Sequence, residues 1–157
     1  MSFAERLANR MNRMLDRGRS ADAADAATTE PTGSIDDLKG RKYCVLVTYK
    51  RDGTPMPTPL WFGVGNGKVY AETGESGKAK RIRNNPKVRV APSDSRGKPT
   101  APPFLGTARV IDAGENAAAD RFIQANYGWY RTAYNKLLTN RVPTVIIEVT
   151  PAPRTIG

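Results

Sequence analysis

The sequence predicts a mainly β fold: a small antiparallel barrel of six strands with a few flanking helices. Three observations indicate this class. Runs of β-branched and aromatic residues are separated by short turns that contain Gly, Asp or Asn. Helical patterns are few, and six strands can close on one another so that no edge is exposed. A length of 157 residues with 39% hydrophobic content corresponds to one domain with a core of its own.

The six expected strands cover, in chain order, residues 42–50, 54–64, 68–73, 88–91, 104–112 and 144–149. Turns at 51–53 (Arg-Asp-Gly) and 65–67 (Gly-Asn-Gly) predict two hairpins. Prolines at 55, 57 and 59 cannot sit in a fully paired central strand, so one side of that strand should lack ladder partners. Its backbone groups could then face a flat heterocycle, with Trp61 beside it.

The helical patterns are five. Residues 34–38 begin with a capping box at Ser34, and short helices are expected after Ser76, at 116–125 and at 129–138. Residues 3–17 form a basic amphipathic pattern that we expect to pack on the domain or on a partner subunit. The alternative is a peripheral contact of residues 3–15 with an anionic membrane. Residues 18–33 read as a flexible linker, so we divide the chain into 1–33 and a barrel domain, 34–157.

Composition excludes several kinds of site. The chain has no histidine, which removes Ser-His-Asp and Cys-His nucleophile arrangements and His-based metal ligation. The single cysteine, Cys44, lies in an apolar strand and reads as a core residue. Carboxylates are sparse, and we identify no catalytic acid or base and no metal site. A cofactor would therefore have to supply any redox chemistry.

The segment from Thr73 to Pro86 carries the strongest functional signal. It reads as a strand end, a Gly-Glu-Ser-Gly turn and a helix with Ser76 as N-cap. Three cations, Lys78, Lys80 and Arg81, fall in the first turns, where the helix dipole disfavours positive charge. A bound phosphate would explain them. The alternative is a solvated basic face, and the spacing matches neither the Walker nor the dinucleotide motif.

The order of these motifs is informative beyond the single segment. Tyr43-Cys-Val-Leu-Val-Thr through Pro57-Thr-Pro-Leu-Trp-Phe62, the strand 68–73, and Gly77-Lys-Ala-Lys-Arg-Ile-Arg-Asn-Asn-Pro86 follow one another. This arrangement over residues 36–152 resembles the pyridoxamine-phosphate-oxidase-like split β-barrel family. It is most similar to the B branch of flavin/deazaflavin oxidoreductases, described as coenzyme F420-dependent enzymes.

The resemblance implies an FMN-binding-like split barrel that forms a homodimer, with cofactor sites at the subunit interface. It also implies two groups of cofactor-binding residues. The phosphate group comprises Thr73, Ser76, Gly77, Lys78, Lys80 and Arg81, and the group along the ring comprises Thr58, Pro59, Leu60 and Trp61. The family's flavin oxidase has Ser-Arg-Lys where this chain has Ser76-Gly-Lys78. This departure favours F420 over FMN or FAD, and the basic stretch up to Arg96 would suit an anionic oligoglutamate tail.

The expected function is therefore an F420-dependent oxidoreductase that transfers a hydride to a small unsaturated organic acceptor. Two alternatives stay open on the same fold: an FMN- or FAD-dependent oxidoreductase, and a non-catalytic flavin or deazaflavin carrier. The net charge of +10 also admits nucleic acid as a partner, but no aromatic RNA-binding motif accompanies it and we expect none. The expected location is cytoplasmic, or at a membrane surface through residues 3–15.

Overall fold

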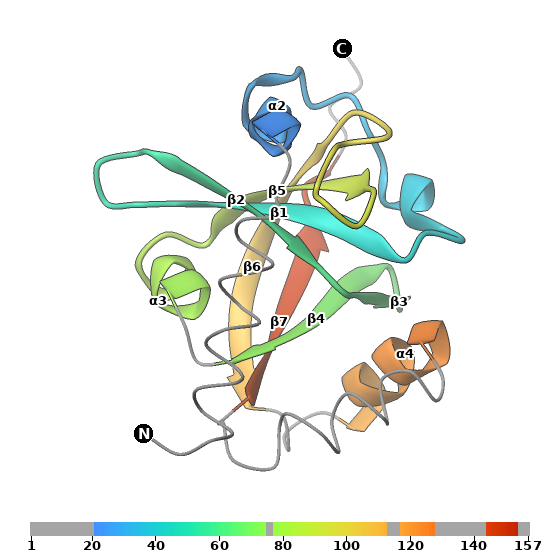
Figure 1. Cartoon of the computed structure of the whole chain (residues 1–157). Helices are drawn as coiled ribbons and strands as arrows, with labels where there is room; N and C mark the ends of the chain where they lie inside the picture. The colour runs from blue at the N-terminus through green and yellow to red at the C-terminus, as the bar shows by residue number, and fades with distance from the viewer. Residues whose placement is uncertain (1–20, 75–76, 113–116, 128–143, 154–157) are drawn as a thin grey trace, which may run out of the picture.

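The computed structural model describes residues 21–74, 77–112, 117–127 and 144–153. A curled antiparallel sheet forms a half-barrel, with helices on its outside and at its mouth (Figure 1). Its strands are β1 (Tyr43–Tyr49), β2 (Pro55–Leu60), β3 (Gly63–Gly65), β4 (Lys68–Gly74), β5 (Lys87–Ser93), β6 (Phe104–Asp112) and β7 (Thr144–Pro151). The helices are η1 (Ala21–Ala24), α2 (Asp25–Thr28), η2 (Ile35–Leu38), α3 (Gly77–Asn84) and α4 (Ala117–Tyr127).

The sheet has seven strands, not six, in the order β2-β1-β5-β6-β7-β4-β3. The extra strand arises because the run predicted over 54–64 breaks at Trp61 and Phe62. Phe62 is 1% exposed and packs into the barrel core. The pieces on either side, β2 and β3, are the two ends of the sheet order. The chain itself therefore joins the two sheet ends, and the barrel is closed there by covalent connection instead of by a ladder.

The proline-rich strand β2 pairs with β1 on one side and is the end strand of the described sheet. Pro57 lies opposite Val47, and Pro59 lies opposite Val45. Because proline has no N–H, the ladder bonds to β1 must come from the residues between the prolines. As predicted, β2 has a ladder partner on one side only among the described strands. The expected backbone donors are not there, since at the proline positions this edge presents only carbonyl acceptors.

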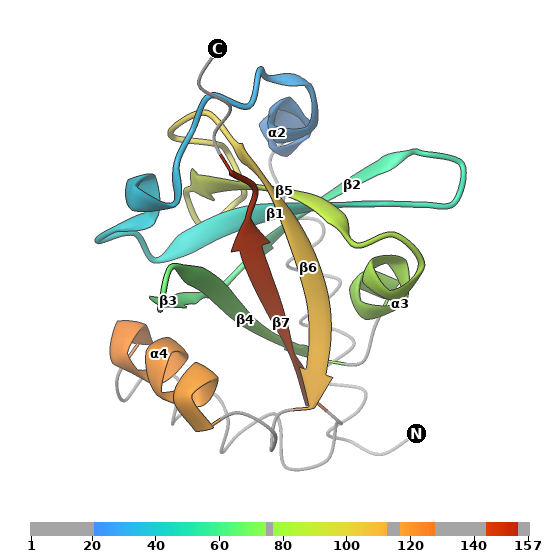
Figure 2. The same cartoon turned by 180° about the vertical axis from the view of Figure 1, so that it is seen from behind.

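Side chains alternate between the inside of the half-barrel and its outer surface. The inner core gathers residues from six strands, η2 and α3; its members include Leu38, Leu46, Phe62, Val69, Val88, Val90, Ile147 and Val149. Two smaller clusters lie on the outer surface. One packs β1 and β5 against η1 and α2, and the other packs Tyr70 and Ile146 against Ile123 of α4. Figure 2 shows these two coverings at opposite ends of the barrel.

The interpretation of residues 18–33 as a flexible linker is wrong for residues 21–33. Ala23 and Ala26 are 1% and 0% exposed and pack on Val45 and Val47. Further along the segment, the N–H of Gly33 donates to the carbonyl of Pro103 (2.9 Å). Alanine is small enough to let this segment lie close to the sheet, which composition alone does not reveal. The division of the chain at residue 33 stays a prediction.

Helix α4 confirms the helix predicted at 116–125, and it lies very close to β3. A Cβ on Gly63 would meet the Phe122 carbonyl at 2.4 Å, so this position requires glycine. Asn126 fastens the end of α4, because its Nδ2 donates to the carbonyl of Phe62 (2.8 Å). Lys42 Nζ in turn donates to the backbone carbonyl of Asn126.

Two predicted helices, at 3–17 and 129–138, lie outside the described residues. The proposed membrane contact of residues 3–15 falls in the first of these and stays a prediction. Within the described ranges, no helix is both long and apolar enough to cross a membrane.

Candidate cofactor site

The strand–turn–helix predicted from the sequence is present as β4 followed by α3. Ala79 and Ile82 of α3 are buried, which seats the helix beside β1 and β6. Its end is also as expected: the N–H of Asn85 donates to the Arg81 carbonyl (2.7 Å), and Pro86 cannot continue the helix. Figure 1 shows α3 below the β1–β2 hairpin, at one opening of the half-barrel. The first turn of α3 thus lies at the rim.

Arg81 is the best defined cation of this rim. Its Nε donates to Oγ1 of Thr48 (2.7 Å), and its side chain runs back along α3, since a Cβ on Gly77 would lie 2.9 Å from Arg81 NH1. The guanidinium is therefore held beside the first residue of the helix. Burial lowers the pKa of Arg81, and no described carboxylate forms an ion pair with it. A charged guanidinium at the positive end of a helix favours an anionic ligand.

The other predicted phosphate residues are placed differently. Lys78 is half-buried and lies three positions before Arg81, so the two side chains share one side of α3. Lys80 is exposed and points about 100° away from Arg81 around the helix axis. Ser76 lies outside the described residues. The structure therefore brings Gly77, Lys78 and Arg81 together and leaves Lys80 apart from them.

Thr73 and the β2 residues contribute to the same rim to different degrees. Thr73 is half-buried and shares the inner face of β4 with Val69 and Ala71. Thr58 lies opposite Leu46 of β1 and so shares its inward face. β2 and β4 contact one another across the barrel, and Thr73 lies at the end of β4 that leads into α3.

The other three residues predicted to line the ring, Pro59, Leu60 and Trp61, differ in burial and in position. Leu60 is 9% exposed and belongs to the inner core. Pro59 lies on the outer surface, where Gly97 approaches it within van der Waals distance. Trp61 is half-buried at the break between β2 and β3. Of these three, Pro59 and Trp61 are partly exposed and Leu60 is buried.

Thr48 was missed by the sequence reasoning. It is 1% exposed and occupies an inward position of β1, after Cys44 and Leu46 of the core. The sequence does contain a signal for Thr48: it is a polar residue at the third of three alternating positions, and the first two, Cys44 and Leu46, are apolar core positions. Its partner Arg81 is 33 residues away, so the contact itself could not be predicted.

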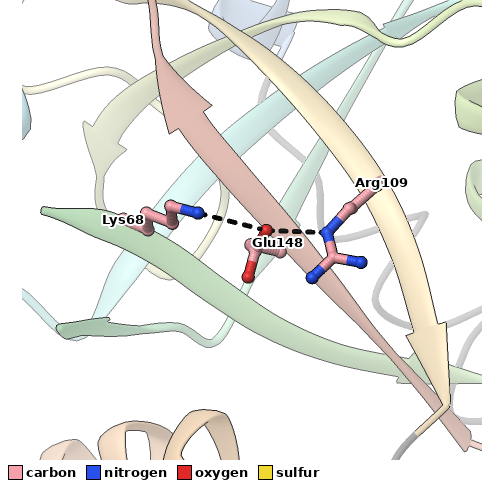
Figure 3. Close-up of polar contacts among 3 residues, drawn as sticks. All are labelled: Lys68, Arg109 and Glu148. Atoms are coloured by element: carbon pink, nitrogen blue, oxygen red, sulfur yellow. Dashed lines mark hydrogen bonds and ion pairs between the residues drawn. The ribbon is translucent and has the colours of Figure 1, made fainter. Parts of the chain in front are cut away.

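A second polar cluster lies on the outer surface, away from this rim (Figure 3). Glu148 of β7 is 5% exposed and accepts from Arg109 Nε (2.8 Å), with Lys68 Nζ at 3.6 Å. The hydrogen bond from Arg109 is the main reason that the pKa of Glu148 lies below its ordinary value. Burial, reinforced by the charge of Glu148, raises the pKa of neighbouring Tyr70. This cluster satisfies its own charges and is structural.

The described part of the chain contains no group suited to acid–base or nucleophilic catalysis at the rim. Burial raises the pKa of the Cys44 thiol to about 12, so this cysteine is an inert core residue, as expected. No cluster of three metal-ligating side chains occurs among the described residues. The rim can bind and orient a phosphorylated ligand.

Comparison with solved structures shows the same fold in proteins of several kinds. An F420 reductase superimposes with a TM-score of 0.57 at 22% identity, over 79% of this chain and 97% of its own. The haem storage protein HutZ from Vibrio cholerae gives 0.58 at 13% identity, over 76% and 87%. A FAD-binding protein from Mesorhizobium loti gives 0.52 at 15% identity, over 75% and 84%. These identities show the fold alone.

A search of curated proteins finds no match to this chain. The sequence model of one family, described as pyridoxamine 5'-phosphate oxidase, does match, and it spans residues 34–153. This range contains the whole sheet and α3, and the resemblance inferred from the motif order points to the same group. The chain belongs to the pyridoxamine 5'-phosphate oxidase family.

Proposed function

We propose that this chain binds the phosphate of coenzyme F420 at the first turn of α3 and acts as an F420-dependent oxidoreductase on a small unsaturated acceptor. The observation that carries the proposal is Arg81. Its guanidinium lies beside Gly77 at the start of α3 and has no ion-pair partner among the described carboxylates. An anion at this place would relieve the conflict between the cation and the helix dipole.

The residues of the rim fit such a ligand. A phosphate can accept hydrogen bonds from the guanidinium fork of Arg81 and from N–H groups of the first helical turn. The side chains of Thr58, Thr73 and Trp61 would line the ring system along the barrel opening. When bound, a deazaflavin supplies hydride transfer; the chain's own residues bind it, orient it and exclude water.

The contact between Gly77 and Arg81 bears on the choice among cofactors. The Arg81 guanidinium occupies the space beside Gly77. The family's flavin oxidase has an arginine at the position of Gly77, so in this chain an arginine from the next turn of the helix takes the place of that side chain. FMN and FAD carry a phosphate at the corresponding position and remain the alternative. A non-catalytic carrier is the second candidate, because the described part of the rim offers no acid or base.

Titration of the purified protein with F420, FMN and FAD, followed by ligand fluorescence, tests the proposal. We expect F420 to bind at least tenfold more tightly than either flavin, and the reduced F420 complex to be oxidised by electron-poor alkenes. Tighter binding of FMN or FAD would contradict the cofactor assignment. Binding of F420 without turnover of any acceptor would support the carrier function instead.

A further inference from the structure

A groove lies at the opposite end of α3 from the predicted phosphate site. It is lined by residues of the β1–β2 hairpin, the end of α3, β5 and β6. Figures 1 and 2 show how these elements are arranged. One part has a volume of about 340 Å³ and is lined by Tyr49, Lys50, Arg51, Asn84 and Asn85. The adjoining part, of about 270 Å³, is lined by Tyr49, Asn85, Lys87, Val88, Arg89 and Leu105. Because the two parts share Tyr49 and Asn85, we treat them as one site, the Tyr49 groove.

The charge of the Tyr49 groove is strongly one-sided. Four cations line it and no carboxylate does; they are Lys50, Arg51, Lys87 and Arg89. None of the four forms an ion pair with a carboxylate of the described residues. The groove lies at the negative end of the α3 dipole, which opposes an anion there, but four full positive charges outweigh that partial charge. The groove therefore attracts anions with more than one charge.

Part of the groove is already held in place. Arg89 NH1 donates to the carbonyl of Thr29 (2.7 Å), a residue of the packed N-terminal segment. Asn85 Oδ1 accepts from the N–H of Lys87 (3.1 Å), which ties the loop after α3 to the start of β5. Asp52 is the one acid of the hairpin turn, and its carboxylate accepts from the N–H of Thr54 (2.9 Å). The Arg89 side chain and the loop after α3 therefore need little ordering when a ligand binds.

The groove also has an apolar side. Leu105 is 45% exposed and is one of two large hydrophobic residues that are exposed within the described ranges. It lies in the groove with the half-buried ring of Tyr49. Ligand sites in proteins commonly combine apolar walls with a few charged groups in a volume of this order. An anion with no apolar part would leave Leu105 exposed to water.

We propose that the Tyr49 groove binds an organic anion that carries two or more phosphate or carboxylate groups beside an apolar or planar portion. This site is separate from the first turn of α3 and does not depend on the function proposed above. The phosphates or carboxylates contact the lysine and arginine side chains, and the apolar or planar part lies over Leu105 and Tyr49.

Calorimetric titration of the full chain with ATP, tripolyphosphate and pentaglutamate tests this proposal. We expect saturable ATP binding that weakens about tenfold in Lys50→Ala/Lys87→Ala, as expected for the loss of two charged contacts. The matched control Lys39→Ala/Lys98→Ala removes the same net charge elsewhere and should change the affinity less than twofold. Leu105→Ser should weaken ATP binding about threefold and leave tripolyphosphate unaffected.

Several results would overturn the proposal. These are no saturable binding of any probe, equal losses in the two double variants, or no effect of Leu105→Ser. Tighter binding of pentaglutamate than of ATP would remove the planar portion from the account. Loss of ATP binding in Arg81→Ala would place the anion at the first turn of α3 instead. Binding of single-stranded DNA with none of the small anions would make the groove a nucleic-acid surface.

Discussion

Arg81 and Arg109 each donate a hydrogen bond through Nε, but they differ in the charge of the acceptor and in the exposure of the side chain. Arg109 Nε donates to a carboxylate, Glu148 Oε1, at 2.8 Å, whereas Arg81 Nε donates to a neutral hydroxyl, Thr48 Oγ1, at 2.7 Å. The Arg109 side chain is 64% exposed, while Arg81 is half-buried beside the start of α3. One positive charge is paired with a carboxylate, and the other is positioned without a neutralising carboxylate among the residues that the structure describes.

The difference separates structure from binding. The Glu148 carboxylate is matched by two cations, Arg109 and Lys68, and the outer surface gains stability from the cluster. Around Arg81 the described residues provide a hydrogen-bond acceptor but no opposite charge. An arrangement that orients a cation and leaves its charge unmatched is suited to an anionic ligand. Substitutions in the two places should therefore affect different properties, stability in the first and ligand affinity in the second.

The largest expected loss of stability comes from Glu148→Ala. It leaves the hydroxyl of Tyr70 without its buried acceptor and removes the partner of both Arg109 and Lys68. Because both cations can be hydrated, we expect a loss of about 2 kcal/mol, below the 3–5 kcal/mol of a fully buried pair. Urea unfolding measures it. A loss near that of the exposed control Asp36→Ala, about 0.5 kcal/mol or less, would show that the cluster contributes nothing.

A smaller effect is expected from Thr48→Val, which keeps the shape of the side chain but removes the acceptor of Arg81. Loss of one hydrogen bond should cost about 1 kcal/mol of stability. Cofactor affinity should fall several-fold because the guanidinium is no longer oriented. Thr48→Ser retains the hydroxyl and serves as the matched control. If both variants bind the cofactor as the wild type does, Thr48 does not position Arg81.

The smallest effect concerns acid stability. The folded-state pKa of Glu148 is lowered, chiefly by the hydrogen bond from Arg109, so its contribution is present above the unfolded-state pKa of about 4.5. This contribution is lost as the pH falls through the lower folded-state value. Between pH 5 and pH 3 the free energy of unfolding should therefore decrease less in Glu148→Gln than in the wild type. The two decreases should differ by roughly 1 kcal/mol or less. Parallel curves of stability against pH would contradict the sign of this shift.

Local patterns in the sequence predicted much of the fold. The Gly-Asn-Gly turn places Asn66 and Gly67 at φ values of 54° and 73°, which is the hairpin geometry that these residues favour. The break at Trp61 and Phe62 was not predicted, because the run around them is continuously apolar and only packing shows where it bends. The burial of Ala23 and Ala26 also depends on packing against the sheet. It was not predicted, because the composition of the segment around them resembles that of a linker.

The site was predicted less completely than the fold. Arg81 was identified as a cation near a helix start, where positive charge is unfavourable. In α3 the residue itself lies in the last turn, and its guanidinium reaches Gly77 because the side chain runs back along the helix. Lys80 has the same local signal, but the helix turns it away from Arg81, since 100° separates successive residues. The contact of Arg81 with Thr48 joins residues far apart in the sequence, and no local pattern carries it. Periodicity and caps predict elements, whereas contacts between elements need the tertiary structure.

The most direct test of the central claim compares a ligand with and without its phosphate. We would titrate the wild type, Arg81→Ala and Arg109→Ala with F420 and with the same deazaflavin ring lacking the phosphate. In the wild type and in Arg109→Ala the phosphate should strengthen binding by the same factor, at least tenfold. In Arg81→Ala that factor should fall about tenfold, the loss of one charge-assisted contact of 1.5–3 kcal/mol. An unchanged factor in Arg81→Ala would contradict the assignment of Arg81 to the phosphate.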